Sequence, residues 1–316
     1  MARPCGICFS QRGSDCEPRA PANGFRLFSS LLGPGQRRLV ARYHVLMQDL
    51  LQSVALRAAR YLEGIQTRRV RPSGASVAAL DAFREAFPEY PTAPDETLQM
   101  LDALGSPATM GIAGPRFFGF VMGGSLPVAL AANWLATAWD QNVGLFGATP
   151  LPALLEEVAL DWLLDALKLP NGCGGAFVTG ATVANFTALA AARHVVLERA
   201  GWNVEDHGLF GAPEVQVVVS EEAHPSVFKS LGMLGLGRER VTRVPVDGQG
   251  RMRADAIPAI SGPGIVCLQA GNVNTGSFDP AREMCRRAHA MGAWVHVDGA
   301  FGLWAATSPR HAQHGL

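Results

Sequence analysis

A single carboxylate, Asp298, follows a short apolar run at residues 294–297 that predicts a buried strand. A carboxylate in an apolar cleft is costly unless a cation or a ligand pairs with it. A protonated heteroaromatic nitrogen is such a partner, and the small residues Gly299 and Ala300 leave room for a flat ring against the chain. The alternative is an aspartate that only caps the following turn.

A second candidate is VTGATVANF, residues 178–186, which predicts a strand, a turn centred on Gly180 and the start of a helix. Unpaired backbone N–H groups and the positive end of the helix dipole attract a phosphate there, and the Thr182 hydroxyl adds a donor. The spacing fits neither GxGxxG nor a P-loop, so an ordinary capped turn between strand and helix is the competing interpretation.

His224 follows the next expected strand and precedes Pro225, a residue suited to the first position of a helix. An imidazole at this point can lie flat against an aromatic ligand, and the alternative is a structural histidine held by hydrogen bonds. The Gly- and Asn-rich run QAGNVNTGSFDP, residues 269–280, follows another buried strand. It indicates a tight loop at the ligand edge of the sheet.

Together, a phosphate cradle, a stacking histidine and a carboxylate for a ring nitrogen describe pyridoxal 5'-phosphate, a flat phosphorylated heterocycle. From about Leu46 to Leu316 the chain also resembles the group II pyridoxal-phosphate-dependent amino-acid decarboxylases, relatives of glutamate, aromatic-amino-acid and histidine decarboxylases. Each motif is weak alone, whereas their common order and spacing are specific. The motifs are PRFFGF (115–120), GGSLP (123–127), GATVAN (180–185), AHPS (223–226), NVNTGSFDP (272–280) and HVDGAFG (296–302).

The resemblance implies cofactor-binding roles for six residues: Ala181 and Thr182 at the phosphate, His224 stacked on the pyridine ring, Asp298 at the protonated ring nitrogen, Ala300 packed against the ring, and Thr275 in the loop below the cofactor. It also implies the activity of a carboxy-lyase, in which the ring acts as an electron sink while the amino acid loses CO2. Asp298 and His224 are the candidate catalytic residues, and no metal is expected.

The sequence has only two lysines, Lys168 and Lys229. The resemblance implies a Schiff-base lysine downstream of the Asp298 motif, after one more strand. Neither Lys168, at the end of a helix, nor Lys229, five residues after His224 on a helix, matches that position. The chain is therefore expected to be the front two-thirds of a decarboxylase, without the C-terminal small domain and the proton-donor loop, and inactive by itself. A fragment, a truncated gene product and a frameshift product are all consistent with this prediction.

The elements that must position these residues follow Pro170, where short apolar runs alternate with helices. This alternation predicts an α/β fold with a mainly parallel sheet and ligands beyond the carboxyl ends of the strands. The resemblance narrows the fold to the large domain of fold type I, aspartate-aminotransferase-like PLP-dependent transferases, with its C-terminal part missing. In that sheet the first strand would have no neighbour in this chain. The expected strands are GAFVTG, VQVVVS, VTRVPV, IVCLQA and WVHVDG.

Upstream, apolar residues recur every three or four positions from Leu39 to Ile65 and predict a helix, and prolines open a second helix over residues 153–167. The domain prediction is a disordered or non-family leader over 1–38, an N-terminal helical segment with a dimer or site wall over 39–150, and an incomplete PLP-binding domain over 151–316. The leader carries Cys5, Cys8 and Cys16, for which incidental cysteines are favoured over a zinc site.

The net charge of zero and the pI of about 7.1 give no electrostatic reason to expect nucleic acid or an anionic membrane as a partner. The uncharged stretch between Arg116 and Asp140 is long enough to span a bilayer. Its glycines, with Pro127 and Asn133, favour a buried core segment with a loop and a helix. The cysteine usage and the lack of a signal peptide favour a reduced, cytoplasmic setting.

The leading function is thus decarboxylation of an amino acid whose side chain the residues do not specify. Two alternatives stay open. One is another fold-type-I lyase or an aminotransferase, and the other is a non-catalytic partner that dimerises with a full-length relative. The resemblance also implies a homodimer, because the N-terminal helices of the family wrap the partner subunit.

Overall fold

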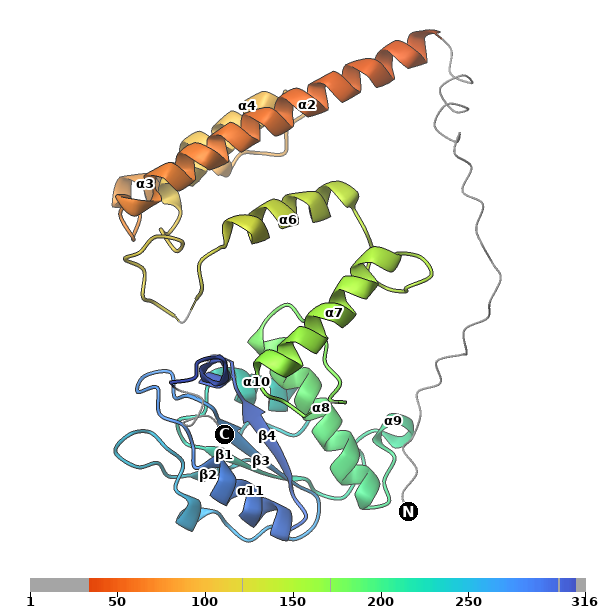
Figure 1. Cartoon of the computed structure of the whole chain (residues 1–316), viewed down its shortest axis with the longest axis vertical. Helices are drawn as coiled ribbons and strands as arrows, with labels where there is room; N and C mark the ends of the chain where they lie inside the picture. Colours follow the sequence, from red (N-terminus) through yellow and green to blue (C-terminus); the bar gives the residue numbers. More distant parts are fainter. Residues whose placement is uncertain (1–33, 121, 171, 301, 311–316) are drawn as a thin grey trace. The chain divides into compact units, whose positions relative to one another are not determined.

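The computed structural model describes residues 34–120, 122–170, 172–300 and 302–310, and the chain divides into two compact units between Gly124 and Ser125 (Figure 1). The first unit is helical, and its long helix starts five residues before the expected start at Leu39. The elements of this unit are α2 (Pro34–Glu63), η1 (Gly64–Gln66), α3 (Gly74–Ala78), η2 (Ala79–Phe83), α4 (Pro94–Met100), the π-helical turn η3 (Leu101–Gly105) and α5 (Ser106–Ala108).

The second unit contains a parallel sheet and its helices. The strands lie in the order β2-β1-β3-β4 and each neighbouring pair is parallel, which confirms the expected α/β fold. The elements are α6 (Pro127–Trp139), α7 (Pro150–Ala166), α8 (Ala181–Arg199), α9 (Val204–His207), β1 (Gln216–Ser220), α10 (Pro225–Met233), β2 (Thr242–Val244), η4 (Ala254–Ala256), β3 (Gly264–Gln269), α11 (Ala281–Ala290), β4 (Trp294–Asp298) and η5 (Gly302–Thr307).

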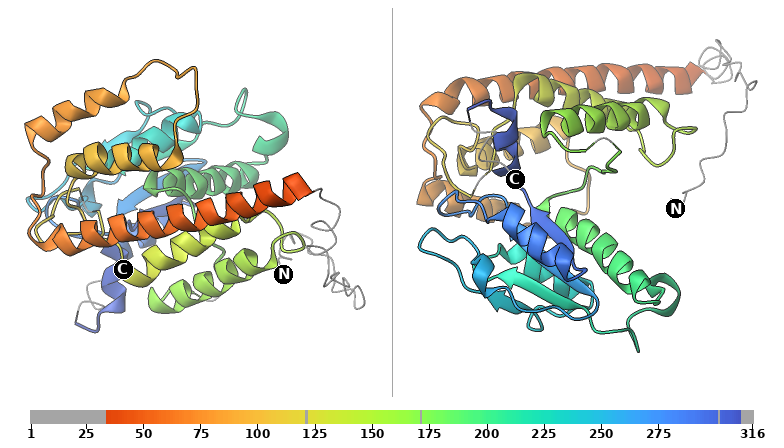
Figure 2. Two further views of the ribbon diagram at one scale, coloured as in Figure 1. Left: turned by 90° about the horizontal axis from the view of Figure 1, so that it is seen from above. Right: turned by 60° about the horizontal axis from the view of Figure 1, so that its bottom comes forward.

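Both faces of the sheet are buried, because successive side chains of a strand point to opposite sides. On one side, Val217 and Val219 of β1 pack with Cys267 of β3 against α8 and α10. On the other side, Val218 of β1 and Val266 of β3 pack against α11. Figure 2 shows α8 and α11 on opposite sides of the strands.

The side chains of β4 continue this alternation, which determines the side of the sheet to which its polar side chains point. Trp294 packs against the core formed with α8 and α10, whereas Val295 and Val297 pack against the core formed with α11. His296 and Asp298 therefore face α8, and both form hydrogen bonds with its first turn.

Two of the expected strands differ in the structure. The segment GAFVTG, residues 175–180, forms no strand, and the side chains of Phe177 and Val178 are 56% and 38% exposed. A strand needs a neighbour to bond its backbone groups, and no strand in the described part of the chain runs beside this segment. The expected strand VTRVPV is shortened to β2, since Pro245 has no N–H for the ladder.

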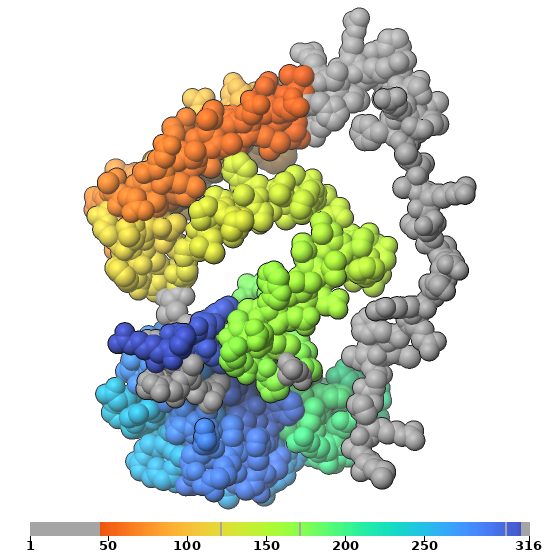
Figure 3. Space-filling view, viewed as in Figure 1, coloured from red at the N-terminus to blue at the C-terminus, as the bar shows by residue number. Residues whose placement is uncertain are grey.

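The apolar segment before residue 140 contains the expected loop and helix. The prediction of burial is not matched within its own unit, where side chains of α6 such as Val128 and Leu135 are 74% and 52% exposed; α6 lies in the yellow-green stretch of Figure 3. Within the described ranges, no helix combines the length and the apolar character that a membrane crossing requires.

Residues 1–33 lie outside the described residues, and with them most of the expected leader and the cysteines at positions 5, 8 and 16. Cys173, Cys267 and Cys285 are free thiols. The described residues contain no cluster of His, Cys, Asp and Glu that could hold a metal ion. The domain boundaries at residues 38 and 150 stay predictions.

Candidate active site

The carboxyl ends of β1, β3 and β4 bring candidate residues to one edge of the sheet. Gln269 at the end of β3 pairs in register with Asp298 at the end of β4, so their side chains share the face that packs on α8. The turn after β1 leads to His224, whose backbone N–H donates to Oε1 of Gln269 at 3.1 Å. His224, Gln269 and Asp298 therefore follow one another in the order of the strands.

The start of α8 has no side-chain cap, and it contains two of the candidate phosphate-binding residues, Ala181 and Thr182. Its N-cap residue Gly180 has φ 156° and ψ 173°, a conformation in which essentially only glycine is relaxed, and no side chain caps the helix. The helix itself does not use the backbone N–H groups of Ala181 and Thr182, which lie at the positive end of its dipole. Ser230 of α10 donates to the carbonyl of Thr182 at 3.0 Å and ties this helix start to α10.

Asn185, one turn into α8, is the centre of a buried hydrogen-bond network, and its side chain is 4% exposed. Its Nδ2 donates to Oδ2 of Asp298 at 3.0 Å and to Oγ of Ser226 at 3.1 Å. Its Oδ1 lies 2.8 Å from Nε2 of His296. The Ser226 hydroxyl lies in turn 2.7 Å from Nδ1 of His224. One amide thus connects the carboxylate of β4 with the histidine at the start of α10.

Neutral donors hold the half-buried carboxylate of Asp298. Oδ2 accepts from Asn185, and Oδ1 accepts the backbone N–H of Ala300 at 3.2 Å, so Asp298 also caps the turn that follows it. No Lys, Arg or His of the described residues lies within 4.0 Å of this carboxylate as an ion-pair partner. The carboxylate retains lone pairs for a cationic N–H donor of a ligand.

His224 has a structural role as the N-cap of α10. Its Nδ1 accepts the backbone N–H of Ser226 at 3.3 Å, while the residue itself is exposed. Capping uses the edge of the imidazole, whereas stacking on an aromatic ligand uses its face. The structural role and the ligand-binding role that the sequence left open are therefore compatible.

The loop after β3 is fixed by the buried residue Asn272. Its Oδ1 accepts the backbone N–H groups of Asn274 and Thr275 at 2.9 and 3.2 Å, and its Nδ2 donates to Oε2 of Glu222 at 2.7 Å. The Thr275 hydroxyl donates to the carbonyl of Gln249 at 2.7 Å. The structure therefore ties Thr275 to the loop at Gln249, whereas the other five candidate residues lie in or next to the network of Asn185.

Asp279 supports the same edge of the sheet from inside the protein. Its carboxylate accepts the backbone N–H groups of Met252 and Gln269, both at 2.7 Å. Burial raises the pKa of Asp279, and these two hydrogen bonds oppose part of the rise. Because Asp279 holds the backbone of Gln269, it also supports the residue that orients His224.

His296 should make the stability of the fold sensitive to acid. Burial lowers its pKa, and the charge of Asp298 opposes only part of that shift. Below about pH 6.5, the ordinary pKa of histidine, the unfolded chain takes up a proton that folded His296 does not. The contribution of neutral His296 to the free energy of unfolding is therefore complete above that pH. It is lost progressively as the pH falls toward the lowered pKa.

The variant His296→Gln keeps an N–H donor near the position of Nε2 and removes the titration. Its free energy of unfolding in urea should depend less on pH between about 6.5 and 5 than that of the unaltered chain. The raised pKa of Asp279 has the opposite effect, but both proteins share it. An equally steep dependence on pH in both proteins would contradict this role of His296.

Reasoning from the sequence did not single out Asn185, Ser226, Gln269 or His296. A signal was present for Asn185, which lies four residues before the buried Leu189 and so on the apolar stripe of α8. A polar residue on a buried stripe needs a hydrogen-bond partner. That partner is set by tertiary structure and cannot be derived from spacing along the chain.

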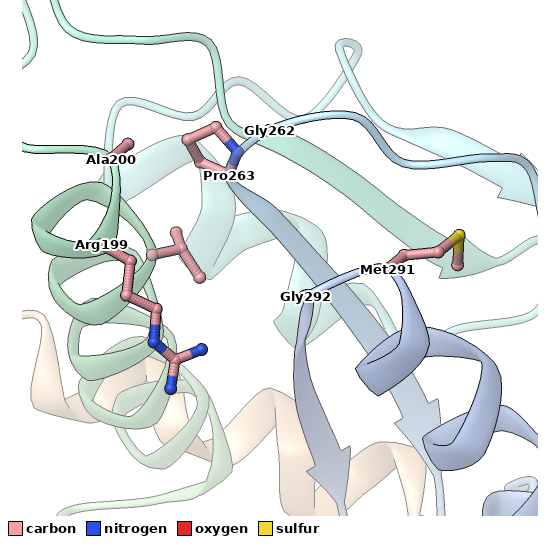
Figure 4. Close-up of a pocket in the computed structure, with 7 residues that line it drawn as sticks. Arg199, Ala200, Gly262, Pro263, Met291 and Gly292 are labelled. Carbon is pink, nitrogen blue, oxygen red and sulfur yellow. The ribbon is translucent and has the colours of Figure 1, made fainter. Parts of the chain in front are cut away.

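A surface hollow of about 310 Å³ lies at the opposite end of the strands (Figure 4). Its walls come from the last turn of α8 and the loops that precede β3 and β4, and its residues are Val196, Arg199, Ala200, Gly262, Pro263, Met291 and Gly292. Because the candidate residues follow the carboxyl ends of the strands, this hollow is not part of their site.

Residues 83–316 match the family model described as the pyridoxal-dependent decarboxylase conserved domain. The chain is 30% identical to the acidic amino acid decarboxylase GADL1 of Bos taurus over 205 residues, which are 62% of this chain and 38% of that protein. It is 26% identical to tryptophan decarboxylase 1 of Oryza sativa subsp. japonica over 276 residues, 80% and 53% of the two chains. It is 32% identical to an L-2,4-diaminobutyrate decarboxylase of Rhizobium meliloti over 182 residues, 55% and 34% of the two chains.

Solved structures share the fold. Mouse CSAD in its apo form superposes with a TM-score of 0.76 at 24% identity, over 86% of this chain and 58% of that one. Oryza sativa TDC with PLP and tryptamine superposes with a TM-score of 0.73 at 25% identity, over 85% of this chain and 57% of that one. The chain thus spans only about a third to a half of the length of the curated relatives that it matches. Since the family model covers α8 and every strand of the sheet, the chain belongs to the pyridoxal-dependent decarboxylase family.

Proposed function

We propose that this chain binds pyridoxal 5'-phosphate at the carboxyl ends of β1, β3 and β4. The observation that carries the proposal is the half-buried carboxylate of Asp298, whose hydrogen bonds within the described residues come from neutral N–H donors. A protonated pyridine nitrogen fits it as the cationic donor. The uncapped helix start at Ala181 and Thr182 suits the phosphate, and the exposed ring of His224 suits the face of the pyridine.

The activity that we propose is decarboxylation of an amino acid, supported by the family description and by the names of three relatives. Bound pyridoxal phosphate supplies an electron sink for the cleavage of the bond to the carboxylate. Asp298 holds a proton at the ring nitrogen, and His224 holds the orientation of the ring. The named relatives act on acidic, aromatic and diamino acids, so the proposed substrate class is no narrower than an amino acid.

We propose that the chain alone does not turn over, because neither lysine is directed at this site. Nζ of Lys168 lies 3.2 Å from Oδ1 of Asp165, and the Lys168 side chain is 69% exposed. Lys229 is exposed on α10 and does not belong to the buried residues of that helix, which are Ser226, Val227, Ser230 and Leu231.

A homodimer is the proposed assembly, and the exposed apolar side chains of α2 and α6 support it. They include Leu51 at 56%, Leu56 at 64% and Val128 at 74% exposure. Such a surface would also serve the second candidate role, that of a non-catalytic partner of a full-length relative. The proposed setting is the cytoplasm, which suits the buried free thiol of Cys267, whose pKa is raised by burial to about 12.

A titration with pyridoxal phosphate tests the proposed site. We expect saturable binding, observed as quenching of tryptophan fluorescence and a change in the absorption of the cofactor. Inorganic phosphate should raise the apparent Kd, since both anions compete for the start of α8. An absence of saturable binding, or a Kd that is insensitive to phosphate, would contradict the proposal.

Two glycine variants give this titration a matched pair. Gly180 and Gly201 both have a positive φ with open space around a built Cβ, but Gly201 lies just beyond the far end of α8. Gly180→Ala should weaken binding about tenfold, because a strained backbone disturbs the N–H groups at the phosphate. Gly201→Ala also places a Cβ at a positive φ and should leave the Kd unchanged. Equal effects of the two changes would show that α8 does not start at the phosphate.

A further inference from the structure

The amide of Asn185 is fully engaged in the first turn of α8. Both hydrogens of Nδ2 are used, one on Asp298 and one on Ser226, and Oδ1 faces Nε2 of His296. The reverse orientation would place the amide oxygen 3.0 Å from a carboxylate oxygen, where the two acceptors repel each other. The orientation of this amide is therefore fixed by its neighbours.

This orientation determines where His296 holds its proton. Since Oδ1 of Asn185 can only accept, Nε2 of His296 must carry the N–H that it shares at 2.8 Å. His296 is buried, and burial also lowers its pKa, so the neutral ring with the proton on Nε2 satisfies the contact. The amide is thus held by β4 at two points, at His296 and at Asp298.

The same orientation passes through Ser226 to His224. The Ser226 hydroxyl oxygen accepts from Asn185, so its own hydrogen is free to donate to Nδ1 of His224 at 2.7 Å. The backbone N–H of Ser226 points at the same nitrogen at 3.3 Å. Nδ1 of His224 therefore accepts, and the exposed imidazole is held by its edge with its proton on Nε2.

Resting on the proposed cofactor site, we propose that Asn185 is a positioning residue that holds both ring contacts, aiming the carboxylate of Asp298 directly and the imidazole of His224 through Ser226. Asn185 is only 4% exposed, so its side chain is not placed to contact the cofactor itself. Its effect on binding must therefore pass through these two residues, and removing either of them should cancel the corresponding part of that effect.

Two double-mutant cycles with pyridoxal phosphate as the probe separate the two routes. Asn185→Leu, which removes all three hydrogen bonds, should weaken binding about tenfold in the unaltered chain and only about threefold when Asp298→Ala is present, because the part that passes through Ser226 remains. Ser226→Ala cuts only the route to the imidazole. It should weaken binding about threefold in the unaltered chain and have no effect in the His224→Ala background.

A readout on the free chain checks the geometry independently. In the chain labelled with nitrogen-15 in histidine, His296 should show a slowly exchanging Nε2–H signal, assigned by its loss in His296→Gln. The signal should persist in Ser226→Ala and vanish or shift in Asn185→Leu. If Asn185→Leu does not fold, Ser226→Ala still provides its own cycle.

The outcomes separate this inference from the proposed function. A chain that binds no pyridoxal phosphate overturns the proposed function and the inference with it. A chain that binds it with additive effects in both cycles, or with the His296 proton on Nδ1, overturns the role of Asn185 alone. Non-additive effects in both cycles together with an Nε2–H signal support it.

Discussion

Replacing Asp298 with alanine is expected to weaken the binding of pyridoxal phosphate by about 10- to 100-fold. A hydrogen bond between charged groups contributes about 1.5–3 kcal/mol, and the change removes the carboxylate that we propose as the partner of the ring nitrogen. Asp298→Asn keeps the size of the side chain but not its charge. Its Kd for pyridoxal phosphate should lie between those of the unaltered chain and Asp298→Ala. The titration by tryptophan fluorescence measures all three proteins.

Asp255→Ala is the control for loss of a carboxylate, since Asp255 is exposed and paired with Arg253 on the surface. It should bind the cofactor as the unaltered chain does. In a longer form that carries a catalytic lysine, Asp298→Ala should also lower kcat. The activation free energy should rise by more than about 3 kcal/mol, because the protonated ring acts mainly in the transition state. Near-normal binding and a near-normal kcat would together remove the assigned role of Asp298.

Borohydride treatment of the chain saturated with pyridoxal phosphate is expected to leave no lysine stoichiometrically labelled. Lys168 is engaged with Asp165, and Lys229 is exposed on α10. Labelling should be sparse and divided between the two lysines, and no CO2 should be released from amino acids. Mass spectrometry of tryptic peptides measures the label.

The variants Lys168→Arg and Lys229→Arg are the controls for this experiment. Both keep the positive charge, and both should leave the reversible binding of the cofactor unchanged. A single stoichiometric pyridoxyl-lysine, accompanied by release of CO2 from an amino acid, would show that this chain carries its own catalytic lysine.

The candidate site was predictable where local sequence and topology act together. Asp298 and His224 follow apolar runs that become parallel strands, and the carboxyl ends of such strands meet at one edge of the sheet. Asn185 was not predicted as a site residue, because its three partners lie 41 to 113 residues away in sequence. Only the packing of α8 on the sheet brings them together.

The fold was less predictable where an element depends on a neighbour. GAFVTG has the composition of a strand, yet a strand forms only when another strand bonds its backbone. The apolar residues of α6 predicted burial, yet several of its side chains are exposed. An apolar composition indicates that a surface is more stable when buried, but it does not identify the element that buries it. Helix α2 was predictable because its spacing of apolar residues is local.

The central claim is that Asp298 holds a proton on the ring nitrogen of a cofactor bound at these strand ends. Pyridoxal phosphate labelled with nitrogen-15 in its ring, bound to the chain and observed by NMR, tests it most directly. We expect the chemical shift of a protonated pyridine in the unaltered chain at a pH where the free ring nitrogen is neutral, and that of a neutral pyridine in Asp298→Ala. A neutral ring nitrogen in the unaltered chain, or the same shift in both proteins, would contradict the claim.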